Sequence, residues 1–150
     1  MDNVRWTASL VEERLAEAAS VLKRLPPVTV QGYFNTWPQM VHEFGDLVGQ
    51  ERVLKRPPPS AAAISRMDQT ITWTIGLDPV DAKILWLRAH GERWKRICAS
   101  VGLARASVNE RWLYGLSVIA WRLNNKRVPK AWSRRRFLTV ARDREPQRSR

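Results

Sequence analysis

The sequence predicts an all-α fold of about six helices, with a C-terminal helix-turn-helix and a basic tail. Apolar residues recur at every third or fourth position in several separate segments, as on one face of an amphipathic helix. Most of these segments start at a Ser, Thr or Asp and stop at a Gly or Pro. No segment of useful length alternates apolar and polar residues, which is the pattern of a half-buried strand.

The first half of the chain contains three of these segments. Either Thr7 or Ser9 can cap the first helix, and Pro26 and Pro27 end it. The apolar stripe of the first helix comprises Val11, Leu15, Ala18, Leu22 and Leu25. A second helix is expected over residues 36–49, on a stripe of Trp37, Val41, Phe44 and Val48. A third helix is expected from a cap at Ser60, after a proline-rich linker, on a stripe of Ile64, Met67, Ile71 and Ile75.

The second half contains three more helices, over residues 79–90, 92–101 and 104–124. Asp78 followed by Pro79 is a cap and a first-turn proline, and Gly91 ends the same helix. The expected buried face of that helix comprises Val80, Ile84 and Leu87.

Charge divides the chain unevenly. The whole chain has 26 Lys and Arg against 14 Asp and Glu, and its first 75 residues hold eight of each kind. The net charge of +12 therefore belongs to the second half. We divide the chain into an N-terminal helical part (1–76), a helix-turn-helix (77–125) and a basic tail (126–150). The neutral first part is expected either to face a protein or to share one core with the second, and the end of the tail to be disordered without a partner.

The basic balance, with a pI near 11.2, favours nucleic acid as the ligand. An anionic membrane is disfavoured, because residues 122–150 lack the apolar face of a membrane-surface helix. No signal peptide and no membrane span are expected, and a single Cys suits a reducing cytoplasm. The predicted partner is double-stranded DNA, for a cytoplasmic, nucleoid-associated protein.

The helix-turn-helix is predicted around Gly102, which supplies a turn residue that tolerates positive φ. Apolar residues should hold its two helices together: Ile97, Cys98, Leu103, Val108 and Trp112. The N-terminal part of the second helix would enter the major groove, where Arg and Asn side chains can bond to base edges. The expected DNA-contacting residues are Lys95, Arg96, Arg105, Ser107, Asn109, Glu110, Arg111, Lys126, Arg127, Arg134, Arg135 and Arg136.

Residues 78–124 resemble region four of bacterial sigma factors, particularly the short extracytoplasmic-function type. The resemblance implies that Arg111 occupies the position of a phosphate- or base-contacting arginine. One residue departs from the pattern, since Ala104 stands where a capping Ser, Thr or Pro is usual. The helix is then expected either to start later, near Ser107, or to be capped by solvent, and a late start would remove Arg105 from the base-reading residues.

The whole chain also resembles an uncharacterised family of small helical proteins from alphaproteobacteria and their prophages. The segments that carry this resemblance are WTASLVEERLAEAASVLKRLPPV, QGYFNTWP, PPPSAAAISRMD, WKRIC and IAWRLN. The resemblance implies a phage-type protein. A more distant similarity links the chain to the sigma-like part of the activators of gene transfer agents.

These observations lead to the expectation of a sequence-specific DNA-binding transcription regulator of phage or prophage type. Its neutral half would form a homo-oligomer, contact RNA polymerase or receive another regulator. The alternatives are the DNA-recognition subunit of a phage packaging assembly, of the small-terminase kind, and a toxin-like or RNA-binding factor, which the basic tail alone supports. An enzyme is not expected, because no nucleophile, Gly-rich phosphate loop or carboxylate pair stands out, and neither a cofactor nor a metal is expected.

Overall fold

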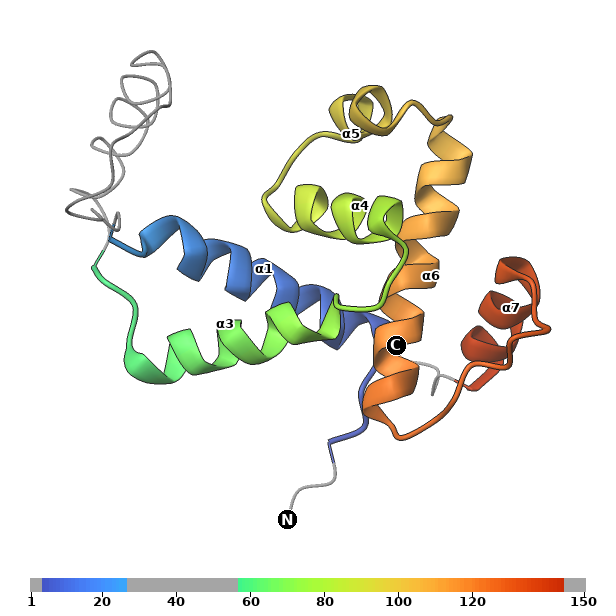
Figure 1. Ribbon diagram of the computed structural model, residues 1–150, viewed down its shortest axis with the longest axis horizontal. Helices are drawn as coiled ribbons and strands as arrows, with labels where there is room; N and C mark the ends of the chain where they lie inside the picture. Colours follow the sequence, from blue (N-terminus) through green and yellow to red (C-terminus); the bar gives the residue numbers. More distant parts are fainter. Residues whose placement is uncertain (1–3, 27–56, 145–150) are drawn as a thin grey trace, which may run out of the picture.

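A computed structural model describes residues 4–26 and 57–144 of the chain (Figure 1). These residues form six helices and no strand, which confirms the all-α prediction. The helices are α1 (Ala8–Arg24), α3 (Ala61–Trp73), α4 (Pro79–Ala89), α5 (Trp94–Val101), α6 (Arg105–Leu123) and α7 (Arg134–Arg144). The helix predicted over residues 36–49 lies outside the described residues. No helix in the described ranges is both long and apolar enough to cross a membrane.

Three helices begin at side chains that the sequence marked as caps. The Thr7 hydroxyl accepts the Leu10 N–H at 3.2 Å, so Thr7, and not Ser9, is the N-cap of α1. The Ser60 hydroxyl accepts the Ala63 N–H at 3.2 Å at the start of α3. Asp78 accepts the Val80 N–H at 2.9 Å at the start of α4. Each cap satisfies a backbone donor that the helix itself leaves unpaired.

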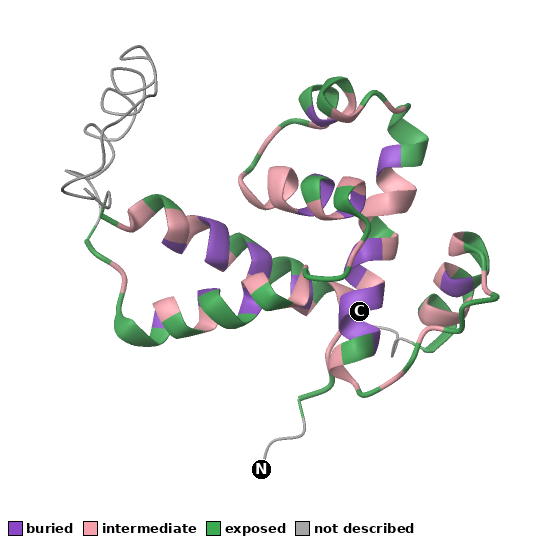
Figure 2. Cartoon of the chain, viewed as in Figure 1, coloured by how far each residue is buried: buried purple, intermediate pink, exposed green. Residues whose placement is uncertain are grey.

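One core joins the N-terminal helices to the rest of the described chain. Helices α1 and α3 lie side by side (Figure 1), and α1 also packs on α4 and α6. Val11 and Leu15 of α1 are buried together with Leu85 of α4 and Leu116 of α6 (Figure 2). The neutral N-terminal half therefore shares one core with the helices of the second half, as one of the two expectations held. A fragment that begins at Leu77 would lose α1 from this core and expose its apolar partners.

Helices α4 and α6 cross closely at Gly115. A Cβ at this position would lie 3.0 Å from a methyl carbon of Leu85, so glycine allows the approach. Leu85 is fully buried here, as is Ile84, while Val80 and Leu87 are half-buried. Val80 and Leu87 nevertheless pack against the buried cluster that contains Ile84, so the predicted face of α4 does face the core.

The structure corrects the end of the third predicted stripe. Helix α3 ends at Trp73, and Ile75 lies beyond it with 70% of its surface exposed. Gly76 has a φ of +83°, so the chain turns there towards α4. Ile75 has helical spacing in the sequence but belongs to the turn.

The structure also corrects the basic tail. Residues 134–144 form α7, whose Phe137 is completely buried against Val118 and Trp121 of α6. The side-chain hydroxyl of Ser133 accepts the Arg136 N–H at 3.3 Å and so caps the helix. The apolar spacing of Phe137, Val140 and Ala141 could have indicated this helix, but the surrounding arginines obscured it. Residues 145–150 lie outside the described part.

A partly exposed ion pair between α1 and α3 gives the fold a pH dependence. Two nitrogens of the Arg66 guanidinium donate to one oxygen of Glu17, at 2.7 and 3.0 Å. These hydrogen bonds lower the pKa of Glu17 below its ordinary 4.5. The ionised carboxylate therefore stabilises the folded state above pH 4.5, and this contribution is lost as pH falls through the lowered pKa.

We expect Glu17→Gln to lower the free energy of unfolding at neutral pH by up to about 1 kcal/mol, because both side chains are partly exposed. The difference from the parent protein should shrink as pH falls below 4.5. Urea unfolding at a series of pH values measures both effects. Glu13→Gln, at an exposed site on the same helix, is the matched control. If Glu17→Gln and the parent protein still differ in free energy of unfolding well below pH 4.5, the ionised Glu17 carboxylate is not the source of the stabilisation.

Candidate nucleic-acid interface

Helices α5 and α6 meet at a tight corner, as the sequence predicted. Gly102 ends α5 in the left-handed region, with a φ of +69°, and its N–H donates to the Cys98 carbonyl at 2.9 Å. Ile97 of α5 and Val108 of α6 are completely buried beside Ile84 of α4. The expected packing of the two helices around the glycine turn is confirmed.

The second helix of the corner, α6, has no capping side chain, yet its start is not delayed. Helix α6 begins at Arg105, and its N-cap residue, Ala104, makes no side-chain hydrogen bond. A start delayed to Ser107 is therefore wrong. Arg105, Ala106 and Ser107 form an exposed first turn at the end of α6 that lies next to α5 (Figure 1).

Trp94 holds two arginines at this corner. Its ring packs edge-on against Trp112, with centroids 5.2 Å apart. The Arg105 guanidinium carbon lies 4.0 Å from the centroid of the Trp94 ring, and that of Arg88 lies 4.7 Å from it. A guanidinium that stacks through its face keeps its N–H edges available to an anion. Arg88 is not among the DNA-contacting residues predicted from the sequence, because its place beside Trp94 depends on how α4 packs on α5.

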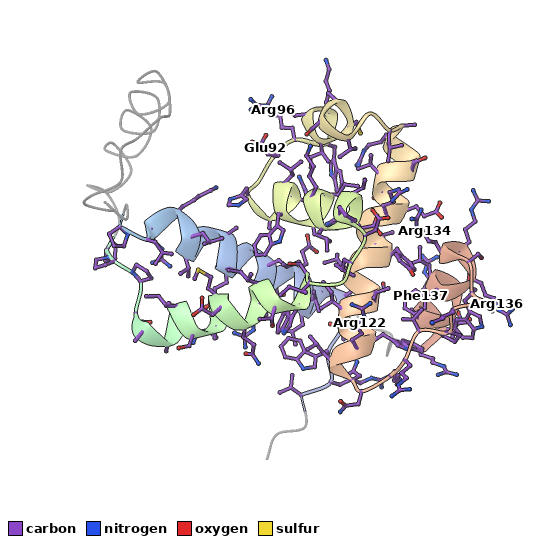
Figure 3. The ribbon with its side chains drawn as sticks, viewed as in Figure 1. Glu92, Arg96, Arg122, Arg134, Arg136 and Phe137 are labelled. Atoms are coloured by element: carbon purple, nitrogen blue, oxygen red, sulfur yellow. The ribbon has the colours of Figure 1, made fainter. Side chains whose placement is uncertain are left out.

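Helix α5 adds further cations at the same end of the molecule. Lys95 and Arg96 are exposed on it. The Arg96 side chain is 80% exposed and makes a 3.5 Å contact with Glu92, and Figure 3 shows both side chains beside α5. An exposed pair of this length holds a guanidinium only weakly, so Arg96 remains available to a phosphate.

Two residues of the predicted reading face are only half exposed. Asn109 and Glu110 lie one turn further along α6. A carboxylate oxygen of Glu110 lies 3.8 Å from the Arg135 guanidinium of α7. Glu110 is thus directed to the α7 side of α6.

Arg111 does not lie on the exposed face of α6, and that prediction is wrong. Its guanidinium donates to Asp81 at 2.9 Å and lies 3.7 Å from Asp78. Only 22% of the Arg111 side chain and 2% of the Asp81 side chain are exposed. The buried carboxylate at the start of α4 draws the arginine inward, so Arg111 joins α6 to α4.

The basic residues after α6 form a second group. Arg134, Arg135 and Arg136 occupy the first turn of α7, where Figure 3 shows Arg134 and Arg136 well apart from Arg96. They are therefore anchored by a packed helix and do not form a loose arm. Lys126 lies over the Trp121 ring at 4.8 Å, and Arg127 is exposed in the connecting loop.

The predicted DNA-contacting residues thus separate into three sets. Lys95, Arg96, Arg105 and Ser107 gather at the corner of α5 and α6, with Asn109 and Glu110 one turn away. Arg111 belongs to the interior. The third set lies along α7 and the loop before it, and comprises Lys126, Arg127, Arg134, Arg135 and Arg136.

Comparison with known proteins gives one result. No curated protein and no solved structure matches the chain. Residues 23–119 match the model of a family described as a domain of unknown function, DUF6362. The matched residues include all of α3, α4 and α5 and most of α6, and stop before α7. Because the match covers more than half of its length, the chain belongs to the DUF6362 family.

Proposed function

We propose that this protein is a sequence-specific DNA-binding transcription regulator of phage or prophage type. The N-terminal half of α6 enters the major groove, and cations on α5 and α7 contact the phosphates on either side. The observation that carries the proposal is the α5–α6 corner. Its inner residues, Ile97 and Val108, are completely buried, while the first turn of α6 is exposed among Lys95, Arg96 and Arg105.

The chemistry of that turn suits base and phosphate recognition. Arg105 and Asn109 are the residue types that bond bidentately to guanine and adenine edges. The stacking of Arg105 on Trp94 reduces the conformational freedom that the arginine would lose on binding. Ala106 between them is small enough to let the helix approach the floor of the groove. Lys95 and Arg96 lie on the preceding helix, where they can reach the sugar–phosphate backbone.

A partner is part of the proposal. A single small reading helix makes a limited interface with DNA. The protein therefore acts with RNA polymerase, with another regulator or with a second copy of itself. The mass of the complex on DNA separates this role from that of a packaging subunit, which would form a large closed ring.

We expect Asn109→Ala to relax the base preference at one or two positions of the preferred site. The loss should be about 1–3 kcal/mol on that site and much less on unrelated duplexes, because a base contact carries sequence information and a phosphate contact does not. Selection from a pool of random duplexes measures the base preference, and titration of the enriched duplexes measures the affinity for each. Gln69→Ala on the exposed surface of α3 is the control. If the folded parent protein enriches no duplex, or Asn109→Ala enriches the same sites equally well, the proposed reading helix is wrong.

A further inference from the structure

A groove of about 580 Å³ lies between the N-terminal segment, α6 and α7. Three distant parts of the chain line it: residues 5–8, part of residues 113–126, and part of residues 138–144. The Asn124 side chain fixes the N-terminal wall, because its amide donates to the Trp6 carbonyl at 2.8 Å and accepts the Trp6 N–H at 3.0 Å. The α7 wall lies beyond the residues that match the family.

The floor of the groove is largely apolar. Apolar side chains of Trp6, Leu113, Trp121 and Leu138 line it together with Ala120 and Ala141, and the hydroxyls of Ser117 and Thr139 also reach it. Leu113 is 37% exposed, which is high for a leucine in the middle of a helix that packs on four others. Among the described residues, no buried side-chain nitrogen or oxygen lacks a partner. The floor therefore offers mainly hydrophobic contact, and no unpaired buried polar atom lies in it to orient a small polar molecule.

The rim of the groove is basic. Arg5, Lys126, Arg142 and Arg144 surround the floor, against one carboxylate, that of Asp143. Lys126 and Arg144 both lie over the Trp121 ring, at 4.8 and 5.6 Å. Within the described ranges none of these four cations forms a salt bridge. Among the described residues, the groove thus combines a largely apolar floor with a rim of four cations and one carboxylate.

We propose that this groove binds an acidic amphipathic segment of a partner protein. One face of such a segment would place a large apolar side chain on Leu113 and Leu138, and its carboxylates would meet the rim cations. DNA fits less well, because phosphates would match the rim but leave the floor unfilled. Trp121 also presents little surface to an unstacked base, since the residue is 9% exposed and two cations lie over its ring.

This inference goes beyond the proposed DNA binding and can fail separately from it. The full-length protein is tested against a displayed library of random peptides of roughly 16 residues, about 24 Å long as a helix. We expect enriched peptides to place Leu or Phe at helical spacing among several Asp and Glu. Fluorescence anisotropy of a labelled enriched peptide then gives its affinity for each protein variant.

Leu113→Asn should lower the affinity for the selected peptide at least about 10-fold, because burying a leucine-sized side chain contributes more than 1.4 kcal/mol to binding. Arg142→Gln should lower the peptide affinity about 2-fold, as expected for one exposed charge. Arg24→Gln on α1 removes one positive charge away from the groove and should leave the peptide affinity unchanged. A thermal melt establishes whether each variant is folded. If Leu113→Asn does not fold, Leu138→Asn replaces it as the variant of the groove floor.

Four results would overturn the inference: no enriched peptide, enrichment without acidic residues, equal binding by folded floor variants, or displacement of the peptide by duplex DNA. The last would assign the groove to the DNA interface. Loss of sequence preference in Asn109→Ala tests the DNA-binding proposal alone, since Asn109 does not line the groove.

Discussion

Replacing Arg111 with Ala should destabilise the folded protein by about 3 kcal/mol, the lower end of the range for breaking a buried ion pair. The variant would leave the Asp81 carboxylate, only 2% exposed in its side chain, without the guanidinium that now lies 2.9 Å away. Chemical denaturation at neutral pH measures the change. Arg96→Ala breaks a pair that is far more exposed, and should change stability by less than about 0.5 kcal/mol.

A double variant tests whether the loss comes from the unpaired carboxylate. Arg111→Met combined with Asp81→Leu removes both charges and should recover much of the lost stability, because apolar groups of similar volume often replace a buried pair at little cost. If Arg111→Ala is as stable as the parent but binds DNA weakly, Arg111 contacts a phosphate or a base, as the sigma-factor resemblance implied, and the structural role assigned to it is wrong.

The second large effect is expected in DNA affinity. Changing Lys95, Arg96 and Arg105 together to Gln should weaken binding to duplex DNA on the order of 100-fold at about 0.1 M salt. If the parent neutralises about six phosphates, its log–log dependence on salt has a slope near −5, and the triple variant should approach about −2 to −3. Titration at several salt concentrations gives both quantities.

Two further triple variants locate the rest of the interface. Changing Arg134, Arg135 and Arg136 to Gln removes three charges from α7 and should flatten the slope if α7 lies along the DNA. Changing Arg14, Lys23 and Arg24 to Gln removes three charges from α1, whose C-terminal end points away from α7 (Figure 1), and should leave the slope unaltered. A parent slope near zero, or equal losses in all three variants, would show that α5 and α6 do not form the DNA-binding surface.

Local sequence signals located most of the helices correctly. Thr7, Ser60 and Asp78 begin helices because their side chains accept backbone N–H groups within three residues. Gly91 and Gly102 end helices because both have positive φ. Such signals depend on neighbours in the chain, so they can be predicted without the rest of the fold. The corner at Gly102 and the burial of Ile97 and Val108 belong to this class.

The errors arose where a residue's environment comes from another part of the chain. Helical spacing placed Arg111 on the outer face of α6, but Asp81, thirty residues earlier, lies beside it in the fold. No helix was predicted in the basic tail, but Phe137 packs on Val118 and Trp121 and residues 134–144 form α7. The basic groove needs the N-terminal segment, α6 and α7 together.

The sequence by itself therefore determined the helical class, the corner of α5 and α6, and the concentration of positive charge in the second half. Periodicity, caps and composition are properties of short segments or of the whole chain, and none requires knowledge of packing. Only the tertiary structure decided which arginines are free to meet a ligand and that Arg111 is instead paired with the buried Asp81. That choice depends on the burial of partners distant in sequence, because a charge taken out of water must be paired, whereas one at the surface need not be.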